Sequence, residues 1–544
     1  MKAIGGIFGA GALAVLLNGI STAALAQASP APAADEAARI AQLEAEVADL
    51  AAEVQDLKRG QAVQVQTLAD VESKQPRAPT AVLSIANGKP QIASADGKFT
   101  ANFHGILQFD AGQYFQDSLG PLSTDLRRSG PALGATAANV DLVHARELKA
   151  GTDVRRARIG VDGTAFGDWD YRLIFDFGGS GVENTGQFYE GWVQYSGWKP
   201  LHARIGAFPP SIGLEDQGST NGMPLLERSV VEDIARGLAA GDTRTAASVW
   251  GAGDHWFASA AVTGRVIGTL NTGTAAAVPQ TFGDQLGFVG RIAGTPLFGA
   301  DWLVHVGAHG SYVARPANTG GPGALGPLAP NAEVIALSNT QELRVDGTKL
   351  INTGNIDARN ASSAGLEFAA QKQNLLLQSE YEQFNVTRND IGLSSPNFHG
   401  WYIEGDWVIT GERRAYNKQT AAFDAPPVAH PFSWGSGGWG AFELAARYSD
   451  MDLNFNAGAP GKAPVADAIR GGEEQNWTIG LNWYPNAFTR LMLDYDNVRI
   501  DRLSPCGGPN SFTSASCTTV WQTKVGSQIG QSYQAIALRS QFAF

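Results

Sequence analysis

The chain has 544 residues, a formal net charge of −12, only 2 cysteines, 65 glycines and 17% charged residues. The acidic balance excludes backbone binding to nucleic acid, which needs clustered Lys and Arg. Beyond the N-terminus no run of about 18 apolar residues occurs, so we expect no transmembrane helix in the mature chain. This length suits several soluble domains or one large barrel with a small extra module.

Residues 1–26 have the features of a signal peptide. Lys2 gives a positive start, a stretch of apolar and small residues follows, and Ala24-Leu25-Ala26 provides an A-x-A cleavage site. A membrane anchor is the alternative, although Asn18 and several glycines interrupt the apolar run. We expect export into an oxidising compartment.

Residues 27–72 are predicted to form a periplasmic coiled coil after an Ala/Pro-rich start. The apolar spacing alternates between three and four residues, which is typical of a coiled-coil seam. The seam residues are Ile40, Leu43, Val47, Leu50, Val54 and Leu57. The spacing does not fix the number of helices, and a lone amphipathic helix is the alternative. The segment 73–97, which contains three prolines, is expected to be a linker.

The stretch from Asp153 to Phe177 predicts two strands joined by a tight turn at Phe166-Gly167-Asp168. Apolar and charged residues alternate in both arms, so the hairpin has one apolar and one charged face. A soluble sandwich could show this pattern, but it recurs to the end of the chain, with aromatic residues near strand ends. The pattern is typical of a transmembrane barrel with lipid outside and water inside.

Residues 98–544 contain about sixteen alternating segments of the ~9–11 residues that a tilted membrane strand needs. The connections between them alternate between short turns and long loops, as in membrane barrels. The link 411–437 breaks this rule, because it is long but falls on the short-turn side. The last segment is amphipathic and ends on the aromatic Phe544, which resembles the C-terminal assembly signal of bacterial outer-membrane proteins. We therefore predict an all-β fold: an antiparallel transmembrane barrel preceded by a short coiled-coil helix.

Several motifs resemble the phosphate-selective porin family, of the porin O and P type. The motifs are RRARIGVDGTAFGDWDYRLIFDF (155–177), MPLLERS (223–229), VITGERRAYN (408–417), GAFELAARYSDMDL (440–453) and the terminal strand. The resemblance implies a sixteen-stranded homotrimeric channel in the outer membrane, with inward-folded segments narrowing the pore. It also implies basic residues that guide small inorganic anions such as phosphate.

Eight basic residues are candidates for the pore lining and for guiding anions. Arg stays protonated and offers forked donors to phosphate-like oxygens. The candidates are Arg156, Arg158, Arg172, Arg204, Arg228, Arg291, Lys349 and Arg413. Strand parity also places Arg447 and Arg490 on the non-lipid face. The alternative is that strand arginines pair with acidic residues across the wall and bind no solute.

Residues 209–244 are the best candidate for a constriction. Pro224 could open a short helix that ends at Leu238. The resemblance implies that a loop here folds into the barrel and places Arg228 in the matching motif; the alternative is a surface loop. We expect that 411–437, with Arg413, could also fold inward.

The chain departs from the family's pattern, since it has few lysines along the expected path and an acidic overall balance. Two other functions therefore stay open. One is a general or weakly cation-preferring porin. The other is a protein that tethers the outer membrane to the cell wall through peptidoglycan contacts of the coiled coil.

We expect no enzyme, no cofactor and no metal site. The chain has no G-x-S-x-G elbow, and His305 and His309 would stand ~13 Å apart on one strand. Cys506 and Cys517 lie in one exported segment and are expected to form a disulfide.

Overall fold

The computed structural model divides the chain into two compact units, Met1–Ala78 and Pro79–Phe544. The predicted signal peptide and both cysteines fall outside the residues that it describes. The described residues are 33–74, 81–86, 89–117, 147–179, 187–267, 284–317, 333–340, 342–435, 437–504 and 526–544.

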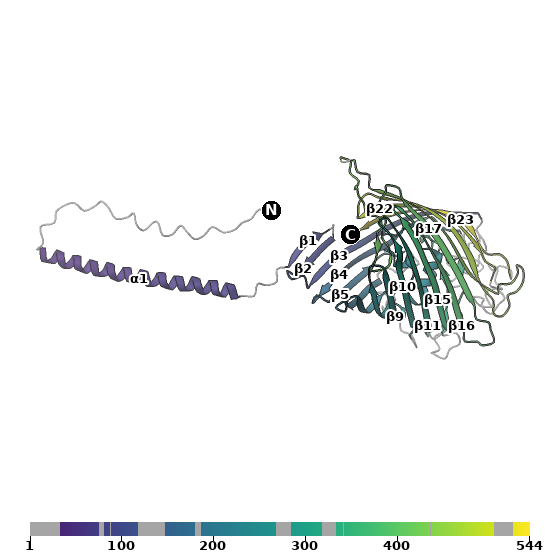
Figure 1. Ribbon diagram of the computed structural model, residues 1–544, viewed down its shortest axis with the longest axis horizontal. Coiled ribbons are helices and arrows are strands. Elements are labelled where there is room, and N and C mark those ends of the chain that lie inside the picture. The colour runs from purple at the N-terminus through teal and green to yellow at the C-terminus, as the bar shows by residue number, and fades with distance from the viewer. Residues whose placement is uncertain are drawn as a thin grey trace, which may run out of the picture. The chain divides into compact units, whose positions relative to one another are not determined.

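The first unit contains one long helix, α1 (Ala33–Lys74; Figure 1). Its heptad residues are exposed, from 48% at Val54 to 65% at Leu57. The helix therefore presents a continuous apolar seam that the described residues do not cover. Within the described residues, no helix is long and apolar enough to cross a membrane.

Sixteen antiparallel strands of the second unit form a closed ring (Figure 1). Each strand pairs with the next in sequence, and the ring closes where Leu538 of the last strand pairs with Ala111 of the first. The strands are β3 (Thr100–Gln116), β4 (Gly151–Ala165), β5 (Trp169–Asp176), β6 (Gln187–Tyr195), β7 (Leu201–Phe208), β8 (Arg244–Ala252), β9 (Trp256–Val266), β10 (Leu286–Phe298), β11 (Trp302–Arg315), β15 (Ile356–Lys372), β16 (Leu375–Arg388), β17 (Asn397–Val408), β20 (Ala441–Phe455), β21 (Ile469–Tyr484), β22 (Thr489–Asp501) and β23 (Ser532–Ala543). The predicted sixteen-stranded barrel is confirmed.

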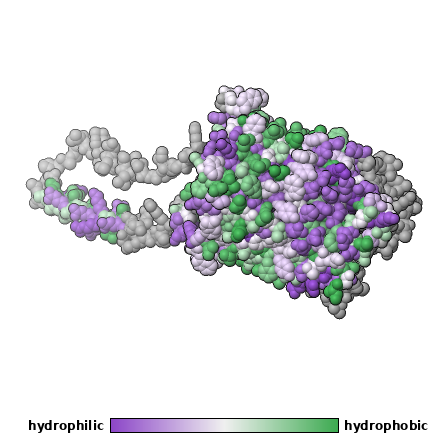
Figure 2. Space-filling view, turned by 45° about the vertical axis from the view of Figure 1, so that its right-hand side comes forward, coloured by the Kyte–Doolittle hydropathy of each residue, from purple (hydrophilic) through white to green (hydrophobic). Residues whose placement is uncertain are grey.

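The period-two pattern of the sequence separates the two faces of the wall. Outward-facing apolar residues such as Ile159, Ile205 and Leu366 are 60–67% exposed, although they are large. Figure 2 shows hydrophobic residues spread over the strand surface. Inward-facing charged residues such as Arg447 and Glu404 are buried. An apolar outside and a charged inside are what a strand needs between lipid and lumen.

Part of the expected linker 73–97 is a β-hairpin. Strands β1 (Val82–Ala86) and β2 (Lys89–Ala93) pair with each other, and β2 pairs with Thr100–Asn102 of β3. The terminal strand pairs with β3 only from Ile106 onward, so β2 continues the sheet where β23 does not reach. The Asn87-Gly88 dipeptide between the two strands is a strong sequence signal for a hairpin.

Three segments that connect wall strands fold into the barrel. Residues 209–243 carry α3 (Leu214–Gln217) and α4 (Val230–Ala239). Residues 333–354 carry β12 (Val334–Ile335), β13 (Ser338–Asn339) and β14 (Ile351–Asn352), and 409–440 carry β18 (Tyr416–Asn417) and β19 (Ala422–Phe423). Side chains of the first two segments join wall residues such as Phe384 and Phe398 in an apolar cluster. The lumen is thus packed with protein over part of its length. Two of these segments, 209–243 and 409–440, correspond to stretches that were expected to fold inward, whereas 333–354 was not.

Helix α4 begins later than the expected start at Pro224. Its N-cap is Ser229, whose hydroxyl accepts a hydrogen bond from the Glu232 amide at 3.3 Å. A serine cap supplies a partner for an amide that has none inside the helix, so it sets the start of the helix. Pro224 instead lies in the preceding stretch, where its carbonyl accepts from Asn482 of β21 at 2.7 Å.

Candidate functional site

A polar cavity of about 810 Å³ lies inside the barrel, bounded by β3–β9 and by the inward-folded segments. Its charged lining contains six permanently basic residues and four carboxylates. The basic residues are Lys89, Arg158, Arg172, Arg204, Arg228 and Arg236, and the acids are Asp162, Asp170, Glu190 and Asp216. The lining alone is therefore positive, although the chain as a whole is acidic.

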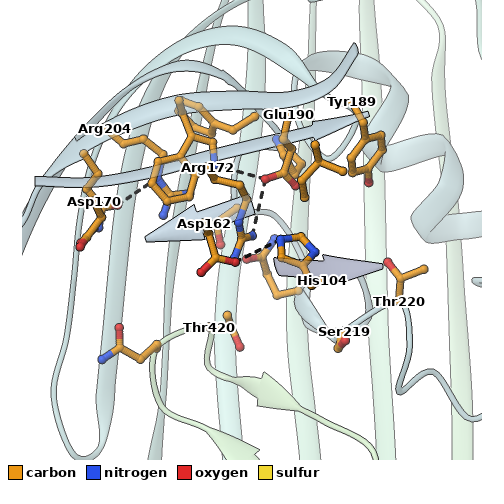
Figure 3. A pocket seen from close by; sticks show the side chains of 18 of the residues that line it. His104, Asp162, Asp170, Arg172, Tyr189, Glu190, Arg204, Ser219, Thr220 and Thr420 are labelled. Atoms are coloured by element: carbon orange, nitrogen blue, oxygen red, sulfur yellow. Dashed lines mark hydrogen bonds and ion pairs between the residues drawn. The ribbon is translucent and has the colours of Figure 1, made fainter. Parts of the chain in front are cut away.

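Arg172 of β5 is one of the residues that line this cavity. Its guanidinium lies between Asp162, at 3.7 Å, and Glu190, at 3.6 Å (Figure 3). Both separations exceed normal hydrogen-bond length, and the side chain is 38% exposed. Arg172 can therefore offer donors to a solute without first breaking a tight ion pair.

Arg204 lies on an aromatic surface beside Arg172. The guanidinium carbon is 4.1 Å from the centre of the Trp192 ring, and Nε donates to Gln194 at 2.9 Å. Stacking on a ring leaves the edge of a guanidinium open and holds its plane. In the described part of the chain, its two terminal amino groups have no protein partner.

Arg158 also lines the cavity but has a closer acidic partner. Its Nε donates to Asp176 at 2.7 Å, and its guanidinium lies 3.6 Å from the centre of the Tyr189 ring. Asp176 offsets much of this positive charge. The sequence also allowed an alternative in which strand arginines pair with acidic residues of the wall and bind no solute. This alternative fits Arg158 better than Arg172.

The segment 209–243 contributes two further arginines, which share one carboxylate. Arg236 Nε lies 2.5 Å and Arg228 Nε 3.6 Å from Asp216 Oδ1. Burial would lower the pKa of Arg236, but Asp216 and the nearby Asp242 and Asp233 outweigh it and raise that pKa well above its usual value. Arg236 thus stays charged inside the barrel.

Four of the eight predicted residues do not line this cavity. Arg156 is buried and donates to Gln108 at 2.7 Å, and Arg291 forms a two-pronged pair with Glu367 at 2.8–2.9 Å. Lys349 donates to Ser338 at 3.1 Å, and burial lowers its pKa. Arg413, on the inward-folded 409–440 segment, donates to Gln371 at 2.8 Å.

A network around Glu227 attaches the segment 209–243 to the wall. Glu227 accepts from Arg155 of β4 at 2.7 and 3.0 Å and from Arg539 of β23 at 2.6 Å. Arg344 approaches it to 3.5 Å. Burial alone would raise the pKa of Glu227, but these guanidinium groups outweigh it and hold that pKa well below its usual range. A carboxylate that stays ionised can hold several arginines, so the segment 209–243 is firmly attached to the wall.

Several lining residues were missed from the sequence. Lys89 lies in the hairpin that was expected to be a linker, and the hydroxyls of Ser219, Thr220 and Thr420 come from inward-folded segments (Figure 3). The Asn87-Gly88 turn signal could have located Lys89. No periodic pattern marks the hydroxyl residues, because they lie in irregular backbone.

The family model described as phosphate-selective porin O and P matches residues 133–508. The chain belongs to the phosphate-selective porin O and P family. It is 25% identical to "Porin O" of Pseudomonas aeruginosa over 364 residues, which are 65% of this chain and 78% of that protein. It is 24% identical to an uncharacterized protein of Caulobacter vibrioides over 426 residues, which are 77% of this chain and 76% of that one.

Solved structures have lower sequence identity to this porin than these relatives do. An anion-selective porin from Comamonas acidovorans is 13% identical, with a TM-score of 0.42 over 82% of this chain and 100% of that chain. The fold is established by the closed strand register rather than by this similarity. Family and barrel together make the protein an outer-membrane porin channel.

Proposed function

We propose that this porin passes small anions and favours oxyanions of the phosphate type. The observation that carries the proposal is the pair Arg172 and Arg204, whose donors are not used up by tight protein contacts. Forked guanidinium donors match the oxygens of phosphate, and their charge does not change at physiological pH. The hydroxyls of Ser219, Thr220 and Thr420 add neutral donors in the same cavity.

An acidic chain could instead favour cations, as the charge of −12 suggests. The field along a pore depends mainly on charges near the path, because salt screens exposed charges beyond about 8–10 Å. Six basic residues and four carboxylates line the cavity, and two of these carboxylates, Asp162 and Glu190, lie 3.7 and 3.6 Å from Arg172. The local arrangement therefore favours anion passage over the cation-preferring alternative.

Phosphate should reduce the chloride current through single channels. We expect a saturable decrease as phosphate is added at constant chloride, because an oxyanion held by Arg172 and Arg204 delays chloride. The measurement is single-channel conductance in a planar bilayer, and the control is nitrate added to the same ionic strength. A phosphate effect no larger than that of nitrate would contradict the oxyanion preference and leave a general anion channel.

We infer that α1 lies in the periplasm and associates with the same helix of other copies in a homotrimer, where it can also contact peptidoglycan. The exposed seam that includes Leu50 supports association. In a chain with Cys506→Ser and Cys517→Ser, we expect Leu50→Cys to form inter-chain disulfides on oxidation and Ala52→Cys, off the seam, to form few. Equal cross-linking at both positions would contradict the coiled coil.

A further inference from the structure

A second cluster of titratable residues lies inside the barrel, away from the arginine cavity. Glu232 of α4, His309 of β11 and Glu382 of β16 place one ligand-type atom each within 4.8 Å of one another. All three side chains are buried, with 0%, 6% and 0% of their residues' surface exposed. The cluster joins the constriction helix to the wall.

The strand register brings two of these groups together. His309 pairs with Gly365 of β15, and Gly365 pairs with Glu382 on its other side, so the three residues form one row across the wall. Because Gly365 has no side chain, His309 and Glu382 meet above it. A Cβ at this position would collide with both groups. The glycine therefore leaves the room that the cluster occupies.

The wall also fixes the orientation of His309. Its Nδ1 lies 2.8 Å from Glu367 Oε1, and Glu367 in turn is held by both prongs of Arg291 at 2.8–2.9 Å. An ionised carboxylate only accepts hydrogen bonds, so Nδ1 carries a proton and donates. Nε2 forms a direct hydrogen bond with Glu382 Oε1, and a metal ion bound by both residues would replace this contact. A carboxylate behind one ring nitrogen is the usual support for a histidine that binds metal through the other nitrogen.

Glu232 is a buried carboxylate that the described residues leave without a hydrogen-bond partner. Neither of its carboxylate oxygens has a hydrogen-bond partner among the described residues, and Glu382 Oε2 also lacks one. The neighbouring Glu380 differs, since it accepts from the Glu215 amide at 2.9 Å and from the Tyr402 hydroxyl at 2.6 Å. Burying an ionised carboxylate without a partner costs free energy. A positively charged ligand at this site would offset that cost.

We propose that Glu232, His309 and Glu382 bind a divalent transition-metal ion of the Zn²⁺ type. One imidazole nitrogen with carboxylate oxygens is a donor set that suits such ions, and water can complete the coordination. The ion ties α4 to β11 and β16 and so holds the constriction segment in place. The sequence led us to expect no metal site, because His305 and His309 would lie too far apart to share one ion. The proposed site needs only His309 and takes its other ligands from α4 and β16.

Metal content tests the site without reference to ion passage. Untagged, folded protein is stripped with a chelator, incubated with Zn²⁺, desalted and measured by mass spectrometry of the elements. Co²⁺ replaces Zn²⁺ in a parallel sample, so that its visible absorption reports nitrogen and oxygen ligands. We expect one ion per chain and a cobalt spectrum that excess Zn²⁺ abolishes. No retained metal in the wild-type protein would overturn the proposal.

The informative variant is Glu232→Gln, because the Glu232 carboxylate makes no hydrogen bond within the described ranges that the change would break. We expect its Zn²⁺ affinity to fall at least ~10-fold. The matched control is Glu474→Gln, which alters another buried glutamate with one unpartnered oxygen, on β21, and should bind as the wild type does. The difference in gel mobility between unheated and heated samples verifies folding. Equal affinity of Glu232→Gln and wild type would overturn the site and indicate that protons neutralise these carboxylates.

Discussion

The double variant Arg172→Gln and Arg204→Gln is expected to lose most of the anion preference of the channel. It leaves four basic residues and four carboxylates in the cavity lining, in place of six and four. A unit charge a few Å from the path contributes about 1 kcal/mol or more, even at high dielectric. We therefore expect the anion-to-cation permeability ratio, obtained from the zero-current potential, to fall roughly tenfold.

The matched control for this variant is Arg499→Gln. Arg499 is 65% exposed at the end of β22 and pairs with Asp501 at 2.8 Å, outside the cavity. Its removal changes the net charge of the chain without changing the lining, so the permeability ratio should stay within about twofold of wild type. If the double variant and Arg499→Gln changed the permeability ratio equally per charge removed, the charge of the whole surface, and not that of the cavity, would set the selectivity.

Glu227→Ala is expected to have the largest effect on stability. It removes a buried counter-charge that Arg155, Arg539 and Arg344 share, and breaking a buried ion pair costs about 3–5 kcal/mol. The free energy of unfolding, measured by urea titration in phospholipid vesicles with tryptophan fluorescence, should fall by this amount. Channels that still form should show unstable conductance, because the segment 209–243 has lost one of its buried attachments to the wall.

The control for Glu227 is Asp254→Ala on the surface. Asp254 pairs with Lys418 at 2.7 Å, but the two side chains are 82% and 56% exposed. Exposed pairs contribute about 0–1 kcal/mol, so this change should scarcely move the unfolding midpoint. If Glu227→Ala destabilised the protein no more than Asp254→Ala, the segment would not depend on the network around Glu227.

The barrel was predictable because its wall follows a local rule. Apolar and polar residues must alternate in a strand between lipid and lumen. A stretch such as Asp153–Phe177 therefore predicts both the strands and the face that each residue occupies. The terminal strand was recognised from its amphipathic pattern and its final Phe544, but its pairing with β3, which closes the barrel, comes from the structure.

The interior was less predictable, because its contacts join segments far apart in the chain. Arg291 and Arg172 have the same strand parity, yet one is locked by Glu367 and the other lies in the cavity. The difference depends on which carboxylate the neighbouring strands bring opposite each arginine. Likewise, nothing in the sequence near His309 points to Glu232, which reaches it from an inward-folded helix.

The most direct test of anion passage is the zero-current potential of the wild-type channel across a planar bilayer with unequal KCl on its two sides. If the arginines of the cavity select the permeating ion, chloride carries most of the current. The potential then lies close to the equilibrium potential of chloride. A potential close to that of potassium would contradict the account.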